Sequence, residues 1–379
     1  MFKRESGEVK LYFDPSNKDT LSRLEKCPHL YQQSEFKVTD ADRINDINES
    51  EPTIKNGVSL YPPWMMYNSH YMNYYAAFAI PKLNLKSTRE ILVNPNDGGT
   101  VSLDWFDLGE YSEDCPTVLV CHGLTGGSHE RYIQYFAKHS YKEQGFRTVV
   151  LNYRGCAGNQ VTADIGYCAT QIEDLKMAVK HVTEKLPKVE KWFLLGFSLG
   201  ASIVVNYLND AGDSSPFVAH ASISNPMNMV ECTKNLKATY LNNYLYNQGL
   251  AKNIKKLFSK WGDGIYKYAT KEEIAAAKTI YDLDTLVTHK MFGYKSATHY
   301  YEEASSSRNI QNLKKPILFI NASDDPIAPV IGFPFYKFKH NPNTILAVSR
   351  WGAHLGFIDQ KDHQSWADKA VTEYFTSFL

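Results

Sequence analysis

A serine in a glycine turn is the first feature of this sequence that could do chemistry. Ser198 lies at the centre of Gly196-Phe-Ser-Leu-Gly200, a G-x-S-x-G pentapeptide. The pentapeptide stands where the apolar run 191–198 ends and a helical pattern begins, so its glycines permit a tight, strained turn that exposes the serine hydroxyl. The start of a helix also favours developing negative charge. We therefore predict Ser198 as a nucleophile; the alternative is a structural serine in a glycine turn.

An acid and a base for such a serine are expected later in the chain, in that order. Asp324 and Asp325 both follow an apolar run. Asp325 precedes Pro326 and is predicted as the acid, which leaves Asp324 as a supporting residue or a turn residue. His354 follows the last predicted strand and is predicted as the base. A loop imidazole there can take the proton from Ser198 while the aspartate fixes its tautomer.

A glycine-rich turn, His122-Gly-Leu-Thr-Gly-Gly127, ends an earlier apolar run and precedes a helical pattern. Backbone N–H groups in such a turn can converge on a point beside the nucleophile. We predict the N–H groups of Leu124 and Leu199 as the donors to an oxyanion, where one donor lowers a barrier by about 3 to 4 kcal/mol. The alternative is a plain glycine-rich turn. His122 and His129 are interpreted as structural histidines.

The elements that must position these residues alternate between apolar runs and amphipathic stretches. Strands are predicted, by their residue numbers, at 90–94, 100–106, 116–123, 146–155, 191–198, 220–226, 316–325 and 343–354. The first two form a hairpin around a turn rich in Gly, Asn and Asp. Helices are predicted at 129–145, 171–187 and 362–379, with one more directly after Ser198. This alternation predicts an α/β fold whose mostly parallel central sheet is flanked by helices, with its site at the carboxyl ends of the strands.

Four parts of the chain differ in composition. Residues 1–55 are polar and mixed, and we predict an irregular N-terminal extension, partly ordered at best. Residues 56–226 and 313–379 carry the sheet pattern and form the two parts of the core. Residues 227–312 are helical in composition and rich in Lys and Tyr, which predicts a helical cap inserted over the site. The alternative for this insertion is a surface decoration with no role.

A segment dense in Trp, Tyr and Met covers residues 58–78. It is interpreted as a flap that lines a substrate tunnel or touches a membrane; the alternative is a segment packed on the core. Interfacial Trp and Tyr suit a lipid boundary, so we expect peripheral contact with a membrane or a lipid droplet. No apolar run is long enough to span a bilayer, and the N-terminus lacks an apolar signal segment.

Charge and cysteine content reduce the number of functions and kinds of site that the sequence could support. The chain has 41 basic and 41 acidic residues, a formal net charge of +0, which gives no indication of nucleic-acid binding. Its six cysteines form no CxxC pair and no metal-ligand spacing. We therefore expect reduced thiols in an intracellular compartment, and neither a metal nor a cofactor.

Together the motifs resemble the AB-hydrolase-4 family of the α/β hydrolases, and within it the fungal medium-chain fatty acid ethyl ester synthase/esterases. The matching segments are His122–His129, Asn152–Ala157, Gly196–Gly200, Asp324–Pro326 and Gly352–His354. The resemblance covers roughly residues 50–379. It implies an α/β-hydrolase fold and passage of an acyl group from an acyl-CoA or a glyceride to the serine, and then to an alcohol or water.

The sequence therefore predicts a serine esterase or acyl-CoA:alcohol O-acyltransferase that acts on medium-chain acyl groups. Its partners are then acyl-CoA, a fatty acyl ester or a glyceride, and a small alcohol. One alternative is a monoacylglycerol or phospholipid lipase, which the same three residues would serve. Another is a catalytically silent hydrolase-fold protein that only binds a ligand; an intact Ser, Asp and His argue against it, because a silent copy has no need of a strained turn.

Overall fold

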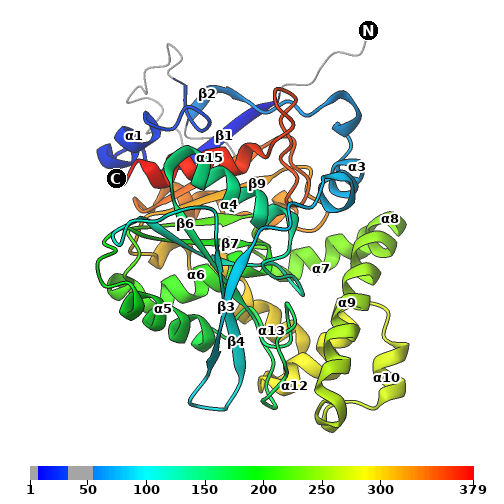
Figure 1. Ribbon diagram of the computed structural model, residues 1–379. Coiled ribbons are helices and arrows are strands. Elements are labelled where there is room, and N and C mark those ends of the chain that lie inside the picture. The colour runs from blue at the N-terminus through cyan, green and yellow to red at the C-terminus, as the bar shows by residue number, and fades with distance from the viewer. Residues whose placement is uncertain (1–6, 33–53) are drawn as a thin grey trace.

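The computed structural model describes residues 7–32 and 54–379, and one sheet runs through their centre (Figure 1). Within these residues the sheet has ten strands in the order β2-β1-β10-β9-β8-β7-β5-β6-β4-β3. The strands are β1 (Glu8–Phe13), β2 (Ile54–Ser59), β3 (Ser87–Val93), β4 (Thr100–Phe106), β5 (Thr117–Cys121), β6 (Arg147–Asn152), β7 (Trp192–Phe197), β8 (Ala219–Ile223), β9 (Ile317–Ala322) and β10 (Thr344–Ser349).

The middle of the sheet is parallel and its two sides are antiparallel. Strands β6, β5, β7, β8, β9 and β10 run in one direction, and every residue of these strands is buried. The hairpin β3–β4 pairs antiparallel with β6, while β1 and β2 form the opposite antiparallel side. The predicted hairpin and the predicted mostly parallel sheet are confirmed. The chain reverses its direction of winding at β5, beside β7, where the carboxyl ends of the strands leave a crevice.

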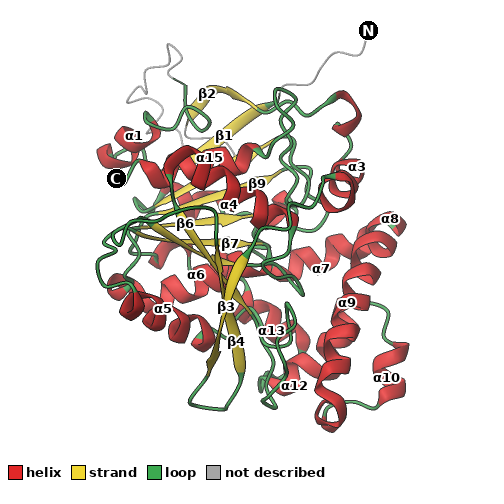
Figure 2. Cartoon of the chain, viewed as in Figure 1, coloured by secondary structure: helices red, strands yellow, loops and turns green. Residues whose placement is uncertain are grey.

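Helices cover both faces of the sheet (Figure 2). On one face α4 (Arg131–Gln144) and α15 (Trp366–Thr376) pack against the side chains of alternate strand residues such as Val118 and Phe193. On the other face α5 (Glu173–Lys185) and α6 (Leu199–Ala211) pack against the intervening residues, such as Leu119 and Leu194. Because successive side chains of a strand point to opposite faces of the sheet, the core forms two layers, one on each face. Shorter elements complete this part: η3 (Gly212–Ser214), η9 (Val330–Gly332) and α14 (Phe335–Lys339).

The prediction of irregular structure for residues 1–55 is wrong where the structure describes them. Strand β1 pairs antiparallel with β10, and α1 (Lys18–Leu24) follows it. Val9, Leu11 and Phe13 are fully buried in the same core layer as α15. The alternation of apolar and polar residues in EVKLYF is a strand pattern, but its partner lies more than 300 residues further along the chain. Residues 1–6 and 33–53 of this extension lie outside the described residues.

Between β8 and β9 the chain forms a group of helices that lies beside the sheet (Figure 1). They are α7 (Met229–Ala238), α8 (Tyr240–Asn242), η4 (Asn243–Asn247), α9 (Gln248–Phe258), η5 (Ser259–Lys267), α10 (Lys271–Ala276), α11 (Ile280–Leu283), η6 (Asp284–Thr288), α12 (His289–Met291), α13 (Ala297–Ala304), η7 (Ser306–Arg308) and η8 (Ile310–Asn312). We refer to residues 227–312 as the cap; its role as a cover stays a prediction.

The segment that we call the flap, residues 58–80, folds into η1 (Trp64–Met66), α3 (Ser69–Tyr74) and the π-helix η2 (Tyr75–Ala79). One side of it is packed: Met66 and Met72 are buried against residues of the loop after β10. The other side is open, since Tyr74 and Phe78 are 60% and 69% exposed. The alternative expectation, a segment packed on the core, is therefore observed for one side of the flap. Contact of its open side with a substrate tunnel or a membrane stays a prediction.

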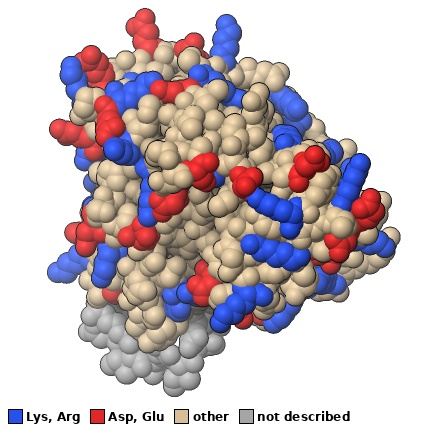
Figure 3. Space-filling model, turned by 90° about the horizontal axis from the view of Figure 1, so that it is seen from below, with Lys and Arg blue, Asp and Glu red and all other residues tan. Residues whose placement is uncertain are grey.

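Charges of both signs are mixed over the face seen from below (Figure 3). This agrees with the balanced composition of the chain. Among the described residues, no helix combines the length and the apolar character that crossing a bilayer requires. All six cysteines lie in the described part of the chain, where each is buried and none forms a disulfide.

Candidate active site

Ser198 stands at the turn between β7 and α6 in a strained backbone conformation. Its φ and ψ angles are 52° and −118°, in a region that side-chain-bearing residues rarely adopt. A Cβ atom on Gly196 would lie 2.5 Å from the carbonyl oxygen of Gly200, and one on Gly200 would lie 2.3 Å from that of Cys121. Both positions therefore require glycine, which lets α6 pack close to the strands and leaves the serine at the start of the helix.

His354 connects Ser198 to Asp325 through two hydrogen bonds. The Oγ of Ser198 lies 2.9 Å from Nε2 of His354, and Oδ2 of Asp325 lies 2.8 Å from Nδ1. A neutral imidazole with its proton on Nδ1 donates to Asp325 and accepts from the serine hydroxyl, which satisfies both contacts. The structure thus brings together the three residues from the loops after β7, β9 and β10.

Asp325 is fixed from its other side. Its side chain is buried, and Oδ1 accepts hydrogen bonds from the N–H groups of Ile327, at 2.7 Å, and Ala328, at 3.0 Å. The second oxygen is left for His354. Because two backbone donors fix one oxygen, the other is held in place to orient the imidazole.

Asp324 faces the same loop but not the imidazole. Its Oδ1 accepts a hydrogen bond from the N–H of Ala353 at 2.8 Å. Its Oδ2 is buried and has no hydrogen-bond partner in the described part of the chain. Burial raises the pKa of the Asp324 carboxyl to about 7, and the nearby charge of Asp325 adds to this rise. The geometry thus separates the two aspartates: Asp325 contacts the histidine ring, and Asp324 supports the backbone before it.

The loop that carries His354 is strained, and two side chains besides that of Asp324 hold its backbone. Ala353 and Leu355, on either side of the histidine, have φ angles of 49° and 69°. The N–H of His354 donates to Oδ1 of Asn73 at 2.8 Å, and the N–H of Leu355 donates to Oγ of Ser224 at 3.1 Å. Such a conformation persists only where the surroundings over-determine it. Asn73, which lies in α3 of the flap, was not predicted from the sequence.

A contact with the cap continues from Asn73. Its Nδ2 donates to the hydroxyl of Tyr246 at 3.0 Å, and this hydroxyl also lies 2.8 Å from Nδ1 of His70. Tyr246 belongs to η4 of the cap, and its ring stacks on that of His70 with 5.6 Å between the centroids. One hydroxyl therefore links the cap to the flap, and the flap holds the backbone of His354.

The glycine-rich turn places several backbone N–H groups beside Ser198. The N–H of Gly123 donates to the hydroxyl of Tyr132 at 3.0 Å, and that of Thr125 donates to the hydroxyl of Tyr167 at 2.8 Å. Between them, the N–H of Leu124 forms no hydrogen bond with any described residue, and neither does that of Leu199 at the start of α6. These two donors are free for a ligand; their role as the oxyanion site stays a prediction.

Buried polar groups hold the glycine-rich turn in place. His122 is fully buried; its Nδ1 lies 2.6 Å from the carbonyl oxygen of Gly123, and its Nε2 accepts from the N–H of Tyr153 at 3.3 Å. Burial lowers the pKa of His122 to about 3, so the ring is neutral. His122 therefore has a structural position, between the ends of β5 and β6.

A second buried group lies at the other end of this turn. Ser128 donates to Asp104 at 2.5 Å, and Asp104 pairs with Arg89 at 2.7 Å.

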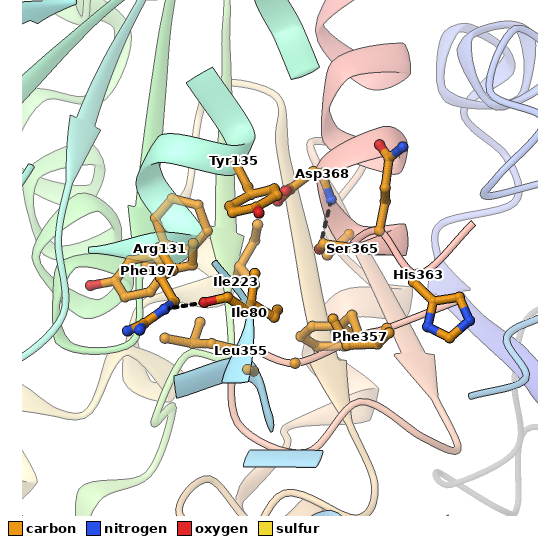
Figure 4. A pocket seen from close by; sticks show the side chains of 16 residues that line it. Ile80, Arg131, Tyr135, Phe197, Ile223, Leu355, Phe357, His363, Ser365 and Asp368 are labelled. Atoms are coloured by element: carbon orange, nitrogen blue, oxygen red, sulfur yellow. Dashed lines mark hydrogen bonds between the residues drawn. The ribbon is translucent and has the colours of Figure 1, made fainter. Parts of the chain in front are cut away.

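A mainly apolar pocket lies beside the histidine loop (Figure 4). It contains ≈ 500 Å³ of empty space, part of it open to solvent. Phe197, which precedes Ser198, and Leu355, which follows His354, form part of its wall, and Ile80 of the flap closes one side. Arg131 donates to the carbonyl oxygen of Ile80 at 2.6 Å, which ties the flap to α4.

One wall of this pocket carries a buried acid, Asp368, at the start of α15. Burial raises the pKa of Asp368 to about 8, so the group is neutral near pH 7. The lining is mainly apolar, with Arg131 as a charged residue in the wall. Elsewhere in the described residues, no group of His, Cys, Asp and Glu is arranged to hold a metal ion.

The sequence is similar over most of its length to several known proteins. An abhydrolase domain-containing protein of Dictyostelium discoideum is 63% identical over 377 residues, which cover 99% of this chain and 95% of that protein. Phospholipase ABHD3 of Mus musculus is 34% identical, with 72% of this chain and 66% of that protein covered. Medium-chain fatty acid ethyl ester synthase/esterase 2 of Saccharomyces cerevisiae is 30% identical, with 72% of this chain and 64% of that protein covered.

A family model described as the alpha/beta hydrolase fold matches residues 116–360, well over half of the chain. The match includes all three residues of the hydrogen-bonded set and the whole cap. It agrees with the observed order of strands, the parallel centre of the sheet and the turn at Ser198. The chain therefore belongs to the α/β-hydrolase fold family.

Proposed function

We propose that this protein is a serine esterase that cleaves acyl esters of lipids through an acyl-serine intermediate on Ser198. The observation that carries the proposal is the placement of His354 within hydrogen-bond distance of both Ser198 and Asp325. This is the arrangement of a nucleophile, a general base and a group that orients the base. A buried carboxylate beside the imidazole also stabilises the imidazolium that forms during the reaction.

The proposed reaction follows from these contacts. As Oγ of Ser198 attacks the ester carbonyl carbon, Nε2 of His354 takes the hydroxyl proton. The carbonyl oxygen becomes an oxyanion, which the N–H groups of Leu124 and Leu199 would receive. His354 then returns the proton to the departing alcohol, and the acyl group remains on Ser198. Attack by water, again with His354 as base, releases the acid and restores the serine.

The substrate class rests on the relatives and on the pocket. The relatives named above include a phospholipase and a fatty acid ethyl ester synthase/esterase, whose names refer to phospholipids and to fatty acid ethyl esters. The two identities to this chain, 34% and 30%, differ too little to indicate which head group its substrate carries. The pocket, whose wall includes Phe197 and Leu355 but neither Ser198 nor His354, offers mainly apolar surface to a hydrocarbon chain. These features support lipid acyl esters as a class, with phospholipids and monoacylglycerols among the candidates.

Covalent labelling tests the proposal. A fluorophosphonate probe should label the parent protein at Ser198, and Ser198→Ala should lose both the label and the hydrolysis of every ester that the parent cleaves. Ser202→Ala is a matched control, since Ser202 lies one turn further along α6 and is buried. A parent protein that the probe does not label would instead be a silent binding protein. A Ser198→Ala variant that keeps its activity would show that the nucleophile is a different residue.

A second candidate is acyl transfer from an acyl-CoA to a small alcohol, with medium-chain acyl groups. The 30% identical yeast relative, named a synthase as well as an esterase, favours it. The link from the cap through Tyr246 to the flap also supports it, because a covered site can keep water from the acyl-serine. The measurement that separates transfer from hydrolysis is the yield of ester and of free acid from one acyl-CoA.

A further inference from the structure

Exposed aromatic rings gather on two neighbouring segments, the flap and the start of the cap. On the flap, Tyr71, Tyr74 and Phe78 follow one another at helical spacing, with 6.5 Å and 5.5 Å between successive ring centroids. On the cap, Tyr240 and Tyr244 stack with 6.0 Å between centroids and 5° between their planes. Tyr240 is 82% exposed and Phe78 is 69% exposed, so both rings are mainly open to solvent.

The two rows of rings belong to one assembly. His70 and Asn73 of α3 contact Tyr246, which is two residues beyond Tyr244. Helices α3 and α8 accordingly lie close together at the upper right of Figure 1. We call the surface formed by Tyr71, Tyr74, Phe78, Tyr240 and Tyr244 the flap–cap face. The link through Asn73 places it next to the loop of His354.

The two segments that carry these rings contain basic residues but no acidic ones. Residues 54–87, which include the flap, contain no Asp or Glu, and neither do residues 232–262, which include α8 and α9. Both segments contain exposed lysines: Lys82, Lys86, Lys234, Lys237, Lys252, Lys256 and Lys260. Lys234 pairs with Glu231, and Lys237 lies over the ring of Tyr281. The whole chain has a formal net charge of +0, so this bias is local. A mixture of exposed aromatic rings and lysines without acids is typical of segments that lie in the interface of an anionic bilayer.

We propose that the flap–cap face docks on the surface of bilayers that contain anionic phospholipid. The rings enter the headgroup region and the lysines contact the lipid phosphates. Docking in this orientation brings the bilayer to the part of the molecule where flap, cap and His354 meet. This use of the face rests on the proposed function, because it would deliver lipid esters to Ser198. The binding itself does not depend on the chemistry, and it can be measured without it.

Flotation with vesicles tests the proposal on the full chain. The protein carries Ser198→Ala in all samples, so that vesicle lipid is not hydrolysed and a failure of the proposed chemistry cannot affect the result. We expect binding to phosphatidylcholine vesicles that contain phosphatidylserine, and weak binding to phosphatidylcholine alone. Added salt should weaken the binding, because the attraction between lysines and anionic lipid is screened over a distance of about 10 Å at 0.1 M salt.

Two double variants address the rings and one addresses the charges. Tyr74→Ser with Phe78→Ser, and Tyr240→Ser with Tyr244→Ser, should each lower the partition coefficient about tenfold or more. Lys82→Glu with Lys237→Glu should remove the preference for anionic vesicles. Ile91→Ser with Val93→Ser is the matched control, because these β3 residues are 65% and 59% exposed but lie outside the face.

Three results would overturn the proposal. The first is the absence of the protein from both kinds of vesicle. The second is an equal loss of binding in the Ile91 and Val93 control. The third is concentration-dependent self-association of the parent that the ring variants abolish, because the face would then join two copies of the chain. As a check on folding, the ring variants with Ser198 restored should hydrolyse a short, water-soluble ester at the parent rate.

Discussion

At the scale of single residues, the adjacent carboxyl groups of Asp324 and Asp325 form different hydrogen bonds, and we expect them to have different roles. Asp325 lies 2.8 Å from the ring of His354, and two backbone N–H groups fix its other oxygen. Asp324 accepts from the backbone one residue before the histidine, and its second oxygen has no hydrogen-bond partner among the described residues. The sequence showed both residues after one strand, and only the position of Pro326 favoured Asp325. The two residues differ in the direction of their side chains, and a sequence alone does not show this direction.

We predict that Asp325→Asn lowers kcat by about 10⁴, because an amide no longer stabilises the required tautomer and the imidazolium. Asp324→Asn should have a much smaller effect, since an amide oxygen can still accept from Ala353. Steady-state kinetics on one ester, with circular dichroism to confirm folding, compares the two variants. Equal losses, or a greater loss at Asp324, would contradict the assignment.

Asn73 is a positioning residue in this scheme, because it contacts the backbone of His354 and not the reacting atoms. We predict that Asn73→Leu lowers kcat about tenfold, the size of one net hydrogen bond, with little change in KM. Asn73→Asp keeps the acceptor and should restore most of the rate. The rate of fluorophosphonate labelling should fall and recover in parallel. A merely structural role would instead lower thermal stability in both variants and leave the labelling rate unchanged.

At the scale of elements, the parts that the sequence predicted are those with local signals. The hairpin, the buried strands and the serine turn each carry apolar runs or glycines within a short window, and each is observed. Strand β1 was missed because its identity depends on pairing with β10, at the far end of the chain. Asn73 was missed for the same reason, since 281 residues separate it from His354. The predicted last strand, 343–354, ends earlier, at Ser349, where the strained loop begins.

The close approach of α6 to β5 depends on Gly200, and this gives a prediction for stability. A Cβ atom there would lie 2.3 Å from the backbone oxygen of Cys121, so strand or helix must shift. We predict that Gly200→Ala lowers the free energy of unfolding by about 1 to 3 kcal/mol. Gly249→Ala is the control: it also lies in a helix, α9, but its Cβ would meet no atom within 4 Å. Denaturant unfolding of both variants should show a loss only for Gly200→Ala.

At the scale of the whole molecule, the cap and the flap meet at one tyrosine hydroxyl. Arg131 ties the flap to α4 by donating to the carbonyl oxygens of Ile80 and Ala77, each at 2.6 Å. Tyr246 ties the flap to the cap through Asn73 and His70. The flap is therefore held on two sides, by the core and by the cap. This arrangement suits a cover that controls which molecules reach an acyl group on Ser198.

The competition between water and an alcohol for that acyl group provides the last prediction. Water is present at about 55 M and a cellular alcohol at about 50 mM, so transfer must overcome roughly a thousandfold excess, or ~4 kcal/mol of barrier difference. A cover that excludes water and binds the alkyl part of the alcohol could supply this difference. Tyr246→Phe removes the hydroxyl that joins cap and flap, and we predict that it shifts the products from ester toward free acid. Tyr266→Phe, at an exposed tyrosine of the cap, is the matched control and should leave the ratio unchanged.

The measurement is the yield of ester and of acid from one medium-chain acyl-CoA across a series of alcohols. A parent protein that makes ester, with a ratio that rises with alcohol length, would support transfer, because longer alkyl groups gain more from an apolar site. The Tyr246→Phe variant should consume acyl-CoA at a comparable rate, since the hydroxyl does not touch the reacting atoms, while its ester fraction falls. If the parent yields only free acid even at high alcohol, transfer is excluded and Ser198 serves hydrolysis alone. If ester forms but the ratio is the same in both tyrosine variants, the link between cap and flap does not control access of water.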